Sequence, residues 1–176
     1  MKRKRLVQAM QDRRYVTVHR RQGWEEVTGY VVGVGDRWVA IVAVPLASFE
    51  GVVVVRRKDV RQLADARRAR RAKAGLRMDR LWPPALPEGV DLDDVRGLLF
   101  SMGSLSRTLG FSNERMASGI FVGQVERITR RRLENREVTP KGRWGHAMTI
   151  DLDRLTRVVL WDPYVERITA LADDRR

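Results

Sequence analysis

Residues 15–63 read YVTVHRRQGWEEVTGYVVGVGDRWVAIVAVPLASFEGVVVVRRKDVRQL, and this stretch decides the fold. Its β-branched residues gather in four short runs, at positions 16–18, 29–34, 38–44 and 52–55. Turn residues such as Gly23, Gly35 and Pro45 stand between the runs. Short strands at this spacing, with no helical segment between them, predict a small antiparallel barrel and not a βαβ unit.

A weaker copy of this pattern occupies residues 107–158. GIFVGQVER, which begins at Gly119, aligns with GYVVGVGDR, which begins at Gly29. IDLDRLTRV, which ends at Val158, aligns with VVRRKDVRQL, and the longer hairpin VTPKGRWG accounts for the greater length of the copy. The sequence therefore predicts a mainly β protein built from a tandem pair of barrels, since two copies are too few for a solenoid.

The composition of this 176-residue chain is that of a soluble globular protein, with 43% hydrophobic and 32% charged residues. No apolar run approaches the roughly 18 residues that a membrane-spanning helix needs. The basic start MKRKRL is not followed by an apolar stretch of signal-peptide type. The chain has no cysteine, which excludes disulfides and zinc fingers. We expect a cytoplasmic protein that does not contact a membrane.

The net charge of +13 is the strongest global feature, and it is unevenly distributed. Residues 1–21 hold eight Lys or Arg against one Asp, and residues 56–80 hold eleven against three. Clusters of this kind favour a polyanionic partner, because each neutralised phosphate releases condensed counterions. A solvated basic surface is the alternative.

Helical segments flank the predicted barrels. Lys4 to Arg13 predicts a short helix before the first barrel, and the Arg/Ala-rich run at 61–80 predicts either an exposed helix or a disordered basic linker. The following LWPPALPEG breaks regular structure and marks a boundary. The resulting domains are a first barrel with its helix, a basic segment with a proline-rich linker, and a second barrel, at 1–64, 65–90 and 91–176.

The second barrel is expected to lie between two helices. The leading helix begins with Asp91 as its N-cap, and the closing helix presents Tyr164, Ile168 and Leu171 at i, i+4 and i+7. Between them we predict five strands, at 107–112, 119–127, 132–138, 147–152 and 157–160.

The first half resembles the Sm-like family, whose small barrels are preceded by a helix. Asp36, Arg56 and Val60 fall at positions of the two Sm motifs, and Gly29 permits the bend of the second strand. The resemblance implies RNA binding, but two features of the family's RNA pocket are missing. Ala40 replaces an Asn that contacts a base in Sm proteins, and an arginine follows Arg56 where the family has glycine.

The second half resembles a family of uncharacterised bacterial proteins built on a small Sm-like barrel. The similar features are Val122-Gly123, the hairpin at 136–144, the segment at 151–158 and the helix start at Asp162 and Tyr164. This resemblance implies a fold and no established activity.

Residues for catalysis or metal binding are few. His19 and His146 are the only histidines and lack metal-ligand spacing. No nucleophile elbow, phosphate-binding loop or zinc-protease motif is present. Asp151 and Asp153 could hold a cation together with Glu114 or Asp162, or they could form a solvated acidic edge. We expect a protein that is not an enzyme and carries no cofactor or metal.

The predicted function is non-enzymatic binding of nucleic acid, with RNA favoured over DNA and phosphate contacts dominant. Trp38 could stack on a base, or it could belong to the core. The candidate binding residues are Lys2, Arg3, Lys4, Arg5, Arg37, Trp38, Arg56, Arg57, Arg67, Arg68, Arg70, Arg71 and Lys73. The alternative is a protein-interaction module that uses barrel edges and basic segments against an acidic partner. Exposed edges also favour a homo-oligomer.

Overall fold

The computed structural model describes residues 3–21, 23–116 and 118–174, and over them the protein is mainly β. The first half contains α1 (Arg3–Gln11), β1 (Tyr15–His19), β2 (Val27–Val34), β3 (Trp38–Ala43), β4 (Val52–Arg56), the 3₁₀ turn η1 (Arg57–Asp59), β5 (Gln62–Asp65) and α2 (Ala69–Met78). The second half contains α3 (Val95–Leu105), β6 (Leu109–Asn113), β7 (Phe121–Ile128), β8 (Arg132–Thr139), β9 (Arg143–Asp151), the 3₁₀ turn η2 (Leu152–Arg154), β10 (Leu155–Leu160) and α4 (Pro163–Asp173).

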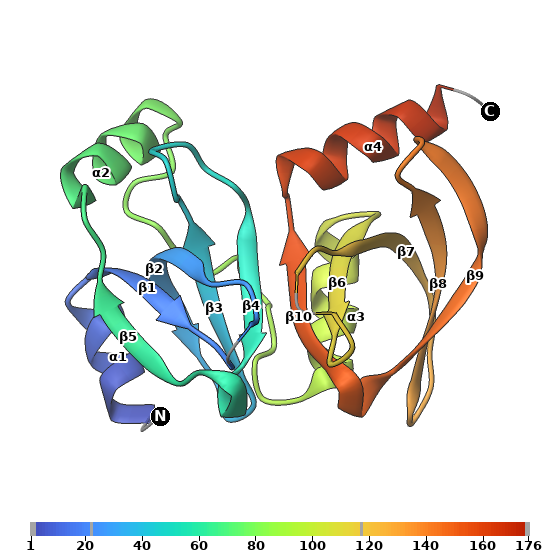
Figure 1. The fold of residues 1–176 in the computed structure, drawn as a ribbon, viewed down its shortest axis with the longest axis horizontal. Helices are drawn as coiled ribbons and strands as arrows, with labels where there is room; N and C mark the ends of the chain where they lie inside the picture. The colour runs from blue at the N-terminus through green and yellow to red at the C-terminus, as the bar shows by residue number, and fades with distance from the viewer. Residues whose placement is uncertain (1–2, 22, 117, 175–176) are drawn as a thin grey trace.

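All ten strands belong to one antiparallel sheet, in the order β5-β1-β2-β3-β4-β10-β6-β7-β8-β9. The second five strands repeat the order of the first five, because β10 takes the place of β5, β6 that of β1, and so on to β9 and β4. The two sets meet where β4 pairs with β10, from Val52 opposite Leu160 to Val55 opposite Arg157. Figure 1 shows the two sets side by side along this junction.

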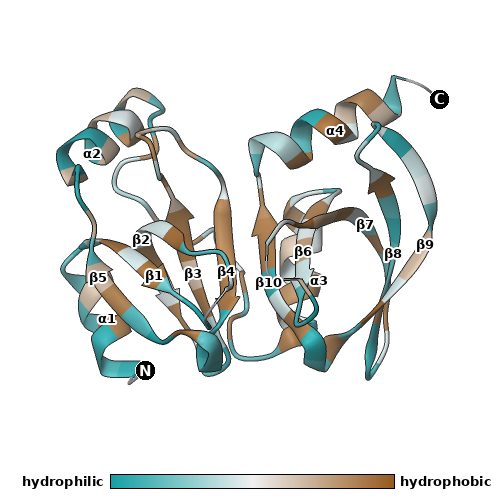
Figure 2. Cartoon of the chain, in the orientation of Figure 1, coloured by the Kyte–Doolittle hydropathy of each residue, from teal (hydrophilic) through white to brown (hydrophobic). Residues whose placement is uncertain are grey.

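The strands at the junction are mostly apolar because both of their faces are covered. In β3 and β4, Ala40, Val42, Val52 and Val54 belong to one buried cluster, whereas Val39, Ile41, Val53 and Val55 on the opposite face belong to another. The first cluster also contains Leu98 of α3 and Phe111 of β6. The two halves therefore share a core, and β3, β4 and β10 are the most hydrophobic strands in Figure 2.

Two glycines mark equivalent bends in the two halves. A Cβ on Gly29 would lie 2.0 Å from the Val42 carbonyl oxygen, and one on Gly123 would lie 2.8 Å from the Arg136 carbonyl oxygen. A register shift follows each glycine by two residues, after Val31 in β2 and after the corresponding Val125 in β7. Gly123, and not Gly119, is thus the counterpart of Gly29. The sequence alignment was wrong there by four positions.

The helices form largely where the sequence predicts them, with two corrections. α3 is capped by Asp94 and not by Asp91, since the Asp94 carboxylate accepts hydrogen bonds from the backbone N–H groups of Arg96 (2.9 Å) and Gly97 (3.1 Å). The buried face of α4 was also predicted wrongly. Ile168 is buried as expected, but Tyr164 and Leu171 are exposed. Asp162 caps α4 and sets its phase so that Val165 and Ala172, among others, face the sheet.

The basic segment is ordered over both β5 and α2. β5 pairs with β1, and α2 buries Ala72 and Leu76. Gly75 permits close packing of α2 on the β3–β4 connection, because a Cβ there would lie 1.7 Å from the Ala47 carbonyl oxygen. The proline-rich linker is packed as well, with Trp82 edge-on to Tyr30 at a ring distance of 5.6 Å. No helix within the described ranges is long and apolar enough to cross a membrane.

Candidate nucleic-acid interface

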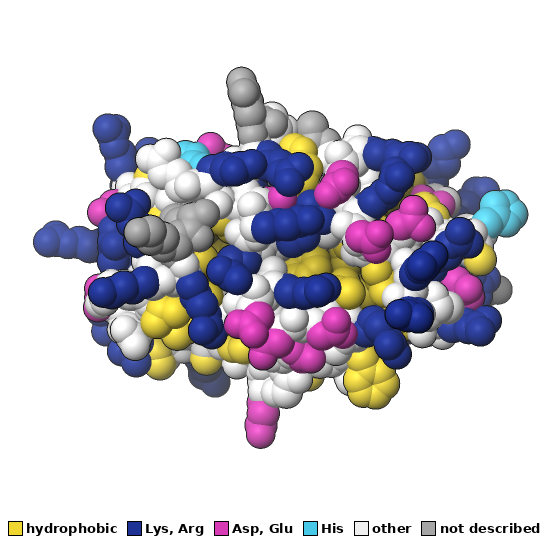
Figure 3. All heavy atoms as spheres, turned by 90° about the horizontal axis from the view of Figure 1, so that it is seen from below, with side chains coloured by type: hydrophobic (Ala, Val, Ile, Leu, Met, Phe, Trp, Pro, Cys, Tyr) yellow, Lys and Arg dark blue, Asp and Glu magenta, His cyan; other side chains and the backbone are white. Residues whose placement is uncertain are grey.

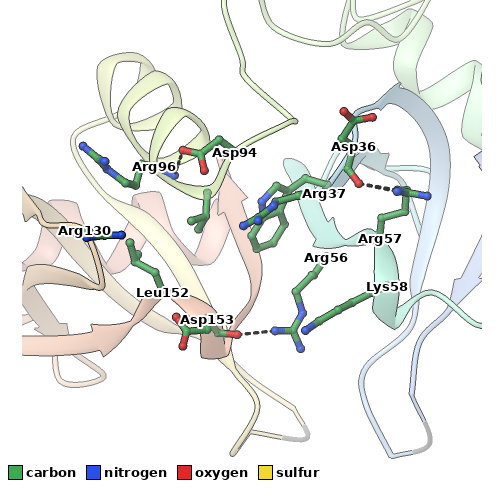
Figure 4. Close-up of a pocket in the computed structure, with 12 residues that line it drawn as sticks. Asp36, Arg37, Arg56, Arg57, Lys58, Asp94, Arg96, Arg130, Leu152 and Asp153 are labelled. Atoms are coloured by element: carbon green, nitrogen blue, oxygen red, sulfur yellow. Dashed lines mark hydrogen bonds between the residues drawn. The ribbon is translucent and has the colours of Figure 1, made fainter.

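A cavity of about 630 Å³ opens at the junction of the two halves. The β4–β5 and β9–β10 connections, which contribute to its lining, lie on the lower side of the molecule in Figure 1. Its apolar lining is Trp38, Val95 and Leu152. Its charged lining consists of Asp36, Arg37, Arg56, Arg57, Lys58, Asp94, Arg96, Arg130 and Asp153. Figure 4 shows that these residues come from both halves: the β2–β3 turn and η1 on one side, and α3, the β7–β8 turn and η2 on the other.

Backbone contacts between the halves fix the walls of this cavity. The backbone N–H groups of Arg37 and Trp38 donate to the carbonyl of Leu92, just before α3, at 3.3 and 3.0 Å. The N–H of Asp36 donates to the carboxylate of Asp93 at 2.6 Å. Gly35 allows this approach, since a Cβ there would lie 2.3 Å from the Leu92 carbonyl oxygen. The β2–β3 turn is therefore held against the start of α3.

Four cations around the cavity have no hydrogen-bonded or ion-paired partner among the described residues, although Arg37 lies near enough to Asp94, and Lys58 near enough to Glu114, to lower the pKa of each carboxyl group. In the part of the chain that the structure describes, the side chains of Arg37, Lys58, Arg96 and Arg130 make no hydrogen bond and no ion pair. The Arg57 guanidinium donates to the carbonyl of Asp36 through Nε (2.9 Å) and Nη2 (2.6 Å), so its charge also lacks an acidic partner. Positive charge from five side chains is thus available at one opening.

Asp94, by contrast, has a structural role. Its burial opposes ionisation, but the backbone N–H groups of Gly97, Arg96 and Val95 and the charge of Arg37 outweigh this and lower the pKa of the carboxyl group. The ionised carboxylate caps α3 and holds the first turn of that helix at the cavity.

Arg56 is committed to contacts inside the chain. Its side chain is 8% exposed and donates through Nε to Asp59 (2.5 Å) and through Nη2 to Glu114 (2.6 Å). Its Nη1 donates to the carbonyl oxygen of Asp153 at 2.6 Å. The bonds to Glu114 and Asp153 join the first half to the second. Arg56 lines the cavity as a structural cross-link, and we do not include it among the proposed contacts to a ligand.

Trp38 lies in the core, which is the alternative that the sequence left open. It is 2% exposed and belongs to the buried cluster that the two halves share. Its side chain contributes to the apolar lining of the cavity and offers no surface platform for a base.

The other predicted residues lie in separate places. Arg3, Lys4 and Arg5 are exposed on α1, and Lys2 lies outside the described residues. Arg67, Arg68, Arg70 and Arg71 are exposed at the start of α2, and the Lys73 ammonium lies over the Trp82 ring, 4.8 Å from its centre. Figure 1 places α1 and α2 at opposite ends of the first half. Of the predicted residues, only Arg37, Trp38, Arg56 and Arg57 come together.

Lys58, Arg96 and Arg130 also line this site but were not among the candidate binding residues taken from the sequence. Lys58 stands beside the predicted Arg57, and Arg130 begins an arginine run after β7. Each lies at a turn or helix start, but nothing in the sequence indicates that the turns of the two copies face each other. Figure 3 shows Lys and Arg side chains across this face, with acidic side chains gathered in patches between them.

The aspartates considered as cation ligands have separate partners or positions. Asp151 lies 3.8 Å from Arg132 and 3.6 Å from Arg154, and Asp162 caps α4. The described residues include no group of three or more His, Cys, Asp or Glu side chains arranged to hold a metal ion.

No protein-family model, curated protein or solved structure matches the chain. The resemblance to Sm-like barrels therefore stays a prediction.

Proposed function

We propose that this protein is a cytoplasmic, non-enzymatic RNA-binding protein that holds a single strand at the cavity between its two halves. The observation that carries the proposal is the set of four unpaired cations, Arg37, Lys58, Arg96 and Arg130, that both halves direct to one opening. None of the four side chains is held by a hydrogen bond or an ion pair to the described residues, so they can reach phosphates, and neutralised phosphates release counterions. Arg57 adds a fifth charge beside them.

The dimensions of the cavity favour a single strand over a duplex. A volume of about 630 Å³ accommodates one or two nucleotides but no double helix. Val95, the half-buried residue of its apolar lining, suits contact with an unstacked base, and its rim suits the phosphates on either side. A duplex would keep its bases stacked and could contact only the rim.

We also propose that the two halves are Sm-like barrels. The support is the repeated strand order, together with the glycine, the register shift and the 3₁₀ turn that recur at equivalent places. In this interpretation the cavity lies between the β2–β3 and β4–β5 connections of one barrel and the corresponding connections of the other.

The exposed arginines of α2 provide a second basic surface for the same ligand. Arg67, Arg68, Arg70 and Arg71 lie away from the cavity, at the other end of the first half. A strand long enough to reach both surfaces would bind more tightly than one confined to the cavity, because the second contact is intramolecular.

The proposal is tested by measuring the binding of labelled single-stranded RNA, single-stranded DNA and duplex DNA over a salt series. We expect RNA to bind most tightly, with an affinity that falls linearly with salt on logarithmic axes. Absence of RNA binding at low salt, where electrostatic attraction is strongest, would refute the proposal, and so would a preference for the duplex.

The second candidate function is a protein-interaction module or homo-oligomer, and the sheet edges favour it. Within the described residues β5 pairs only with β1, and β9 pairs only with β8. Each strand leaves one edge available for another strand. The two edge strands carry polar and charged side chains, QLAD in β5 and RWGHAMTID in β9, whereas the paired β4 and β10 are mostly apolar. Sedimentation at several protein concentrations distinguishes a monomer from an oligomer.

A further inference from the structure

Asp153 is a carboxylate in the cavity without a structural role for its side chain. Its backbone carbonyl accepts a hydrogen bond from Arg56, but over the described residues its carboxylate has no hydrogen bond and no ion pair. The two other acidic residues of the cavity differ from it. Asp94 caps α3, and Asp36 turns its carboxylate away from the remaining labelled side chains in Figure 4.

A free carboxylate among phosphate-binding cations weakens phosphate binding unless the ligand brings a hydrogen-bond donor to it. Lys58 and Arg130 lie on either side of Asp153 in Figure 4. In a nucleotide, the group that lies next to the phosphate is the sugar, and the polar edge of the base lies farther away. An acceptor between two phosphate-binding cations is therefore placed for the sugar.

We propose that Asp153 accepts a hydrogen bond from a ribose 2′-hydroxyl and so makes the cavity selective for RNA over DNA. The inference rests on the proposed binding of a single strand at this cavity. The 2′-hydroxyl is the donor that distinguishes RNA from DNA, and an acidic side chain is a common partner for it. DNA offers no donor at this position, so the Asp153 carboxylate only repels its phosphates.

The test compares wild-type protein with Asp153→Ala on oligonucleotides of one sequence with ribose, 2′-deoxyribose or 2′-O-methylribose. Asp174→Ala is the matched control, because Asp174 is an exposed aspartate at the end of α4 that does not line the cavity. It measures the effect of removing one negative charge. Asp153→Asn keeps an acceptor oxygen without the charge.

We expect wild-type protein to bind the ribose strand about 10- to 100-fold more tightly than the other two, as for a hydrogen bond to a charged group. Asp153→Ala should weaken ribose binding and strengthen deoxyribose binding, which removes most of the preference. Asp153→Asn should retain part of the preference and also bind the deoxyribose strand more tightly. Asp174→Ala should leave the ratio unchanged.

Two outcomes would overturn the inference and leave the proposed function standing. One is RNA binding that Asp153→Ala changes by the same factor as DNA binding. The other is 2′-O-methyl RNA that binds as tightly as RNA, because the methylated oxygen cannot donate. Failure of the wild-type protein to bind any of the three strands would instead refute the proposed function.

Discussion

Replacing Arg56 tests the buried ion-pair network in which it contacts Asp59 of its own half and Glu114 and Asp153 of the other half. Arg56→Met removes the guanidinium that bonds Asp59, Glu114 and the Asp153 carbonyl, while keeping much of the side chain's volume. The Asp59 side chain is 0% exposed, so its charge stays buried after the change. Breaking a buried ion pair by removing one partner costs about 3–5 kcal/mol.

The structure places the expected destabilisation at the low end of that range. Arg21 still lies 2.9 Å from Asp59 and compensates part of its charge. Glu114 is 39% exposed and can return to water, so breaking its ion pair adds no more than about 1 kcal/mol. We therefore expect the free energy of unfolding to fall by about 3 kcal/mol, which for a chain of this size lowers Tm by about 6–12 °C.

Urea denaturation followed by tryptophan fluorescence and by circular dichroism measures this destabilisation. Arg131→Met is the matched control, because the Arg131 side chain is exposed and has no partner among the residues that the structure describes. The control should change stability by less than about 0.5 kcal/mol. Adding Asp59→Asn to Arg56→Met should recover part of the stability. A cost below about 1 kcal/mol for Arg56→Met would refute the role assigned to this cross-link.

Three further predictions concern stability. Arg20 is buried, and its one side-chain hydrogen bond among the described residues goes to the Thr156 carbonyl; desolvation, together with the nearby charge of Arg157, lowers its pKa to about 10. Arg20→Met should therefore leave Tm unchanged or raise it, and a decrease like that of Arg56→Met would contradict this. The hydrogen bond from Arg56 lowers the pKa of Glu114, so the contribution of this contact to folding stability is complete above the ordinary carboxyl pKa near 4.5 and is lost as pH falls through the lowered value. Glu114→Gln should therefore lose less stability than the wild type on acidification. Parallel curves of stability against pH for the two proteins would argue against the contact. Gly29→Ala should reduce the free energy of unfolding by about 2 kcal/mol or more, because the added Cβ would meet the Val42 carbonyl. Gly103→Ala, whose added Cβ would have its nearest neighbouring atom at 3.8 Å, should stabilise α3 by up to about 1 kcal/mol. Equal Tm values for the two variants would contradict the packing.

Much of the fold could be predicted because its signals are local. The β-branched runs separated by turns indicated β1 to β4, and the Asp162 position indicated the start of α4. The internal copy was detectable because glycine and valine recur in the second strand of each half. Which face of a short helix is buried was harder to predict from the sequence. In α4 the Asp162 cap and the neighbouring sheet decide it, so that Val165 is buried and Tyr164 is exposed.

The site could be predicted only in part because it depends on how the two copies meet. Arg37 and Arg57 were identified from their places in one repeat, and the structure brings them together. Arg96 and Arg130 belong to the other half, and only the β4–β10 pairing carries them to the same opening. Arg56 was expected to contact a ligand, but its guanidinium pairs with Asp59 and Glu114. Only the tertiary structure identifies these two partners.

We propose that the cavity, and not basic charge in general, binds the strand. The most direct test compares the salt dependence of single-stranded RNA binding for wild type, the double variant Arg37→Ala with Arg130→Ala, and Arg167→Ala as an exposed control on α4. We expect the double variant to weaken binding at least tenfold and to lower the slope of log affinity against log salt by about 0.7 for each phosphate that is no longer neutralised. The control should bind like the wild type. A double variant that keeps the wild-type affinity and slope would contradict the proposal.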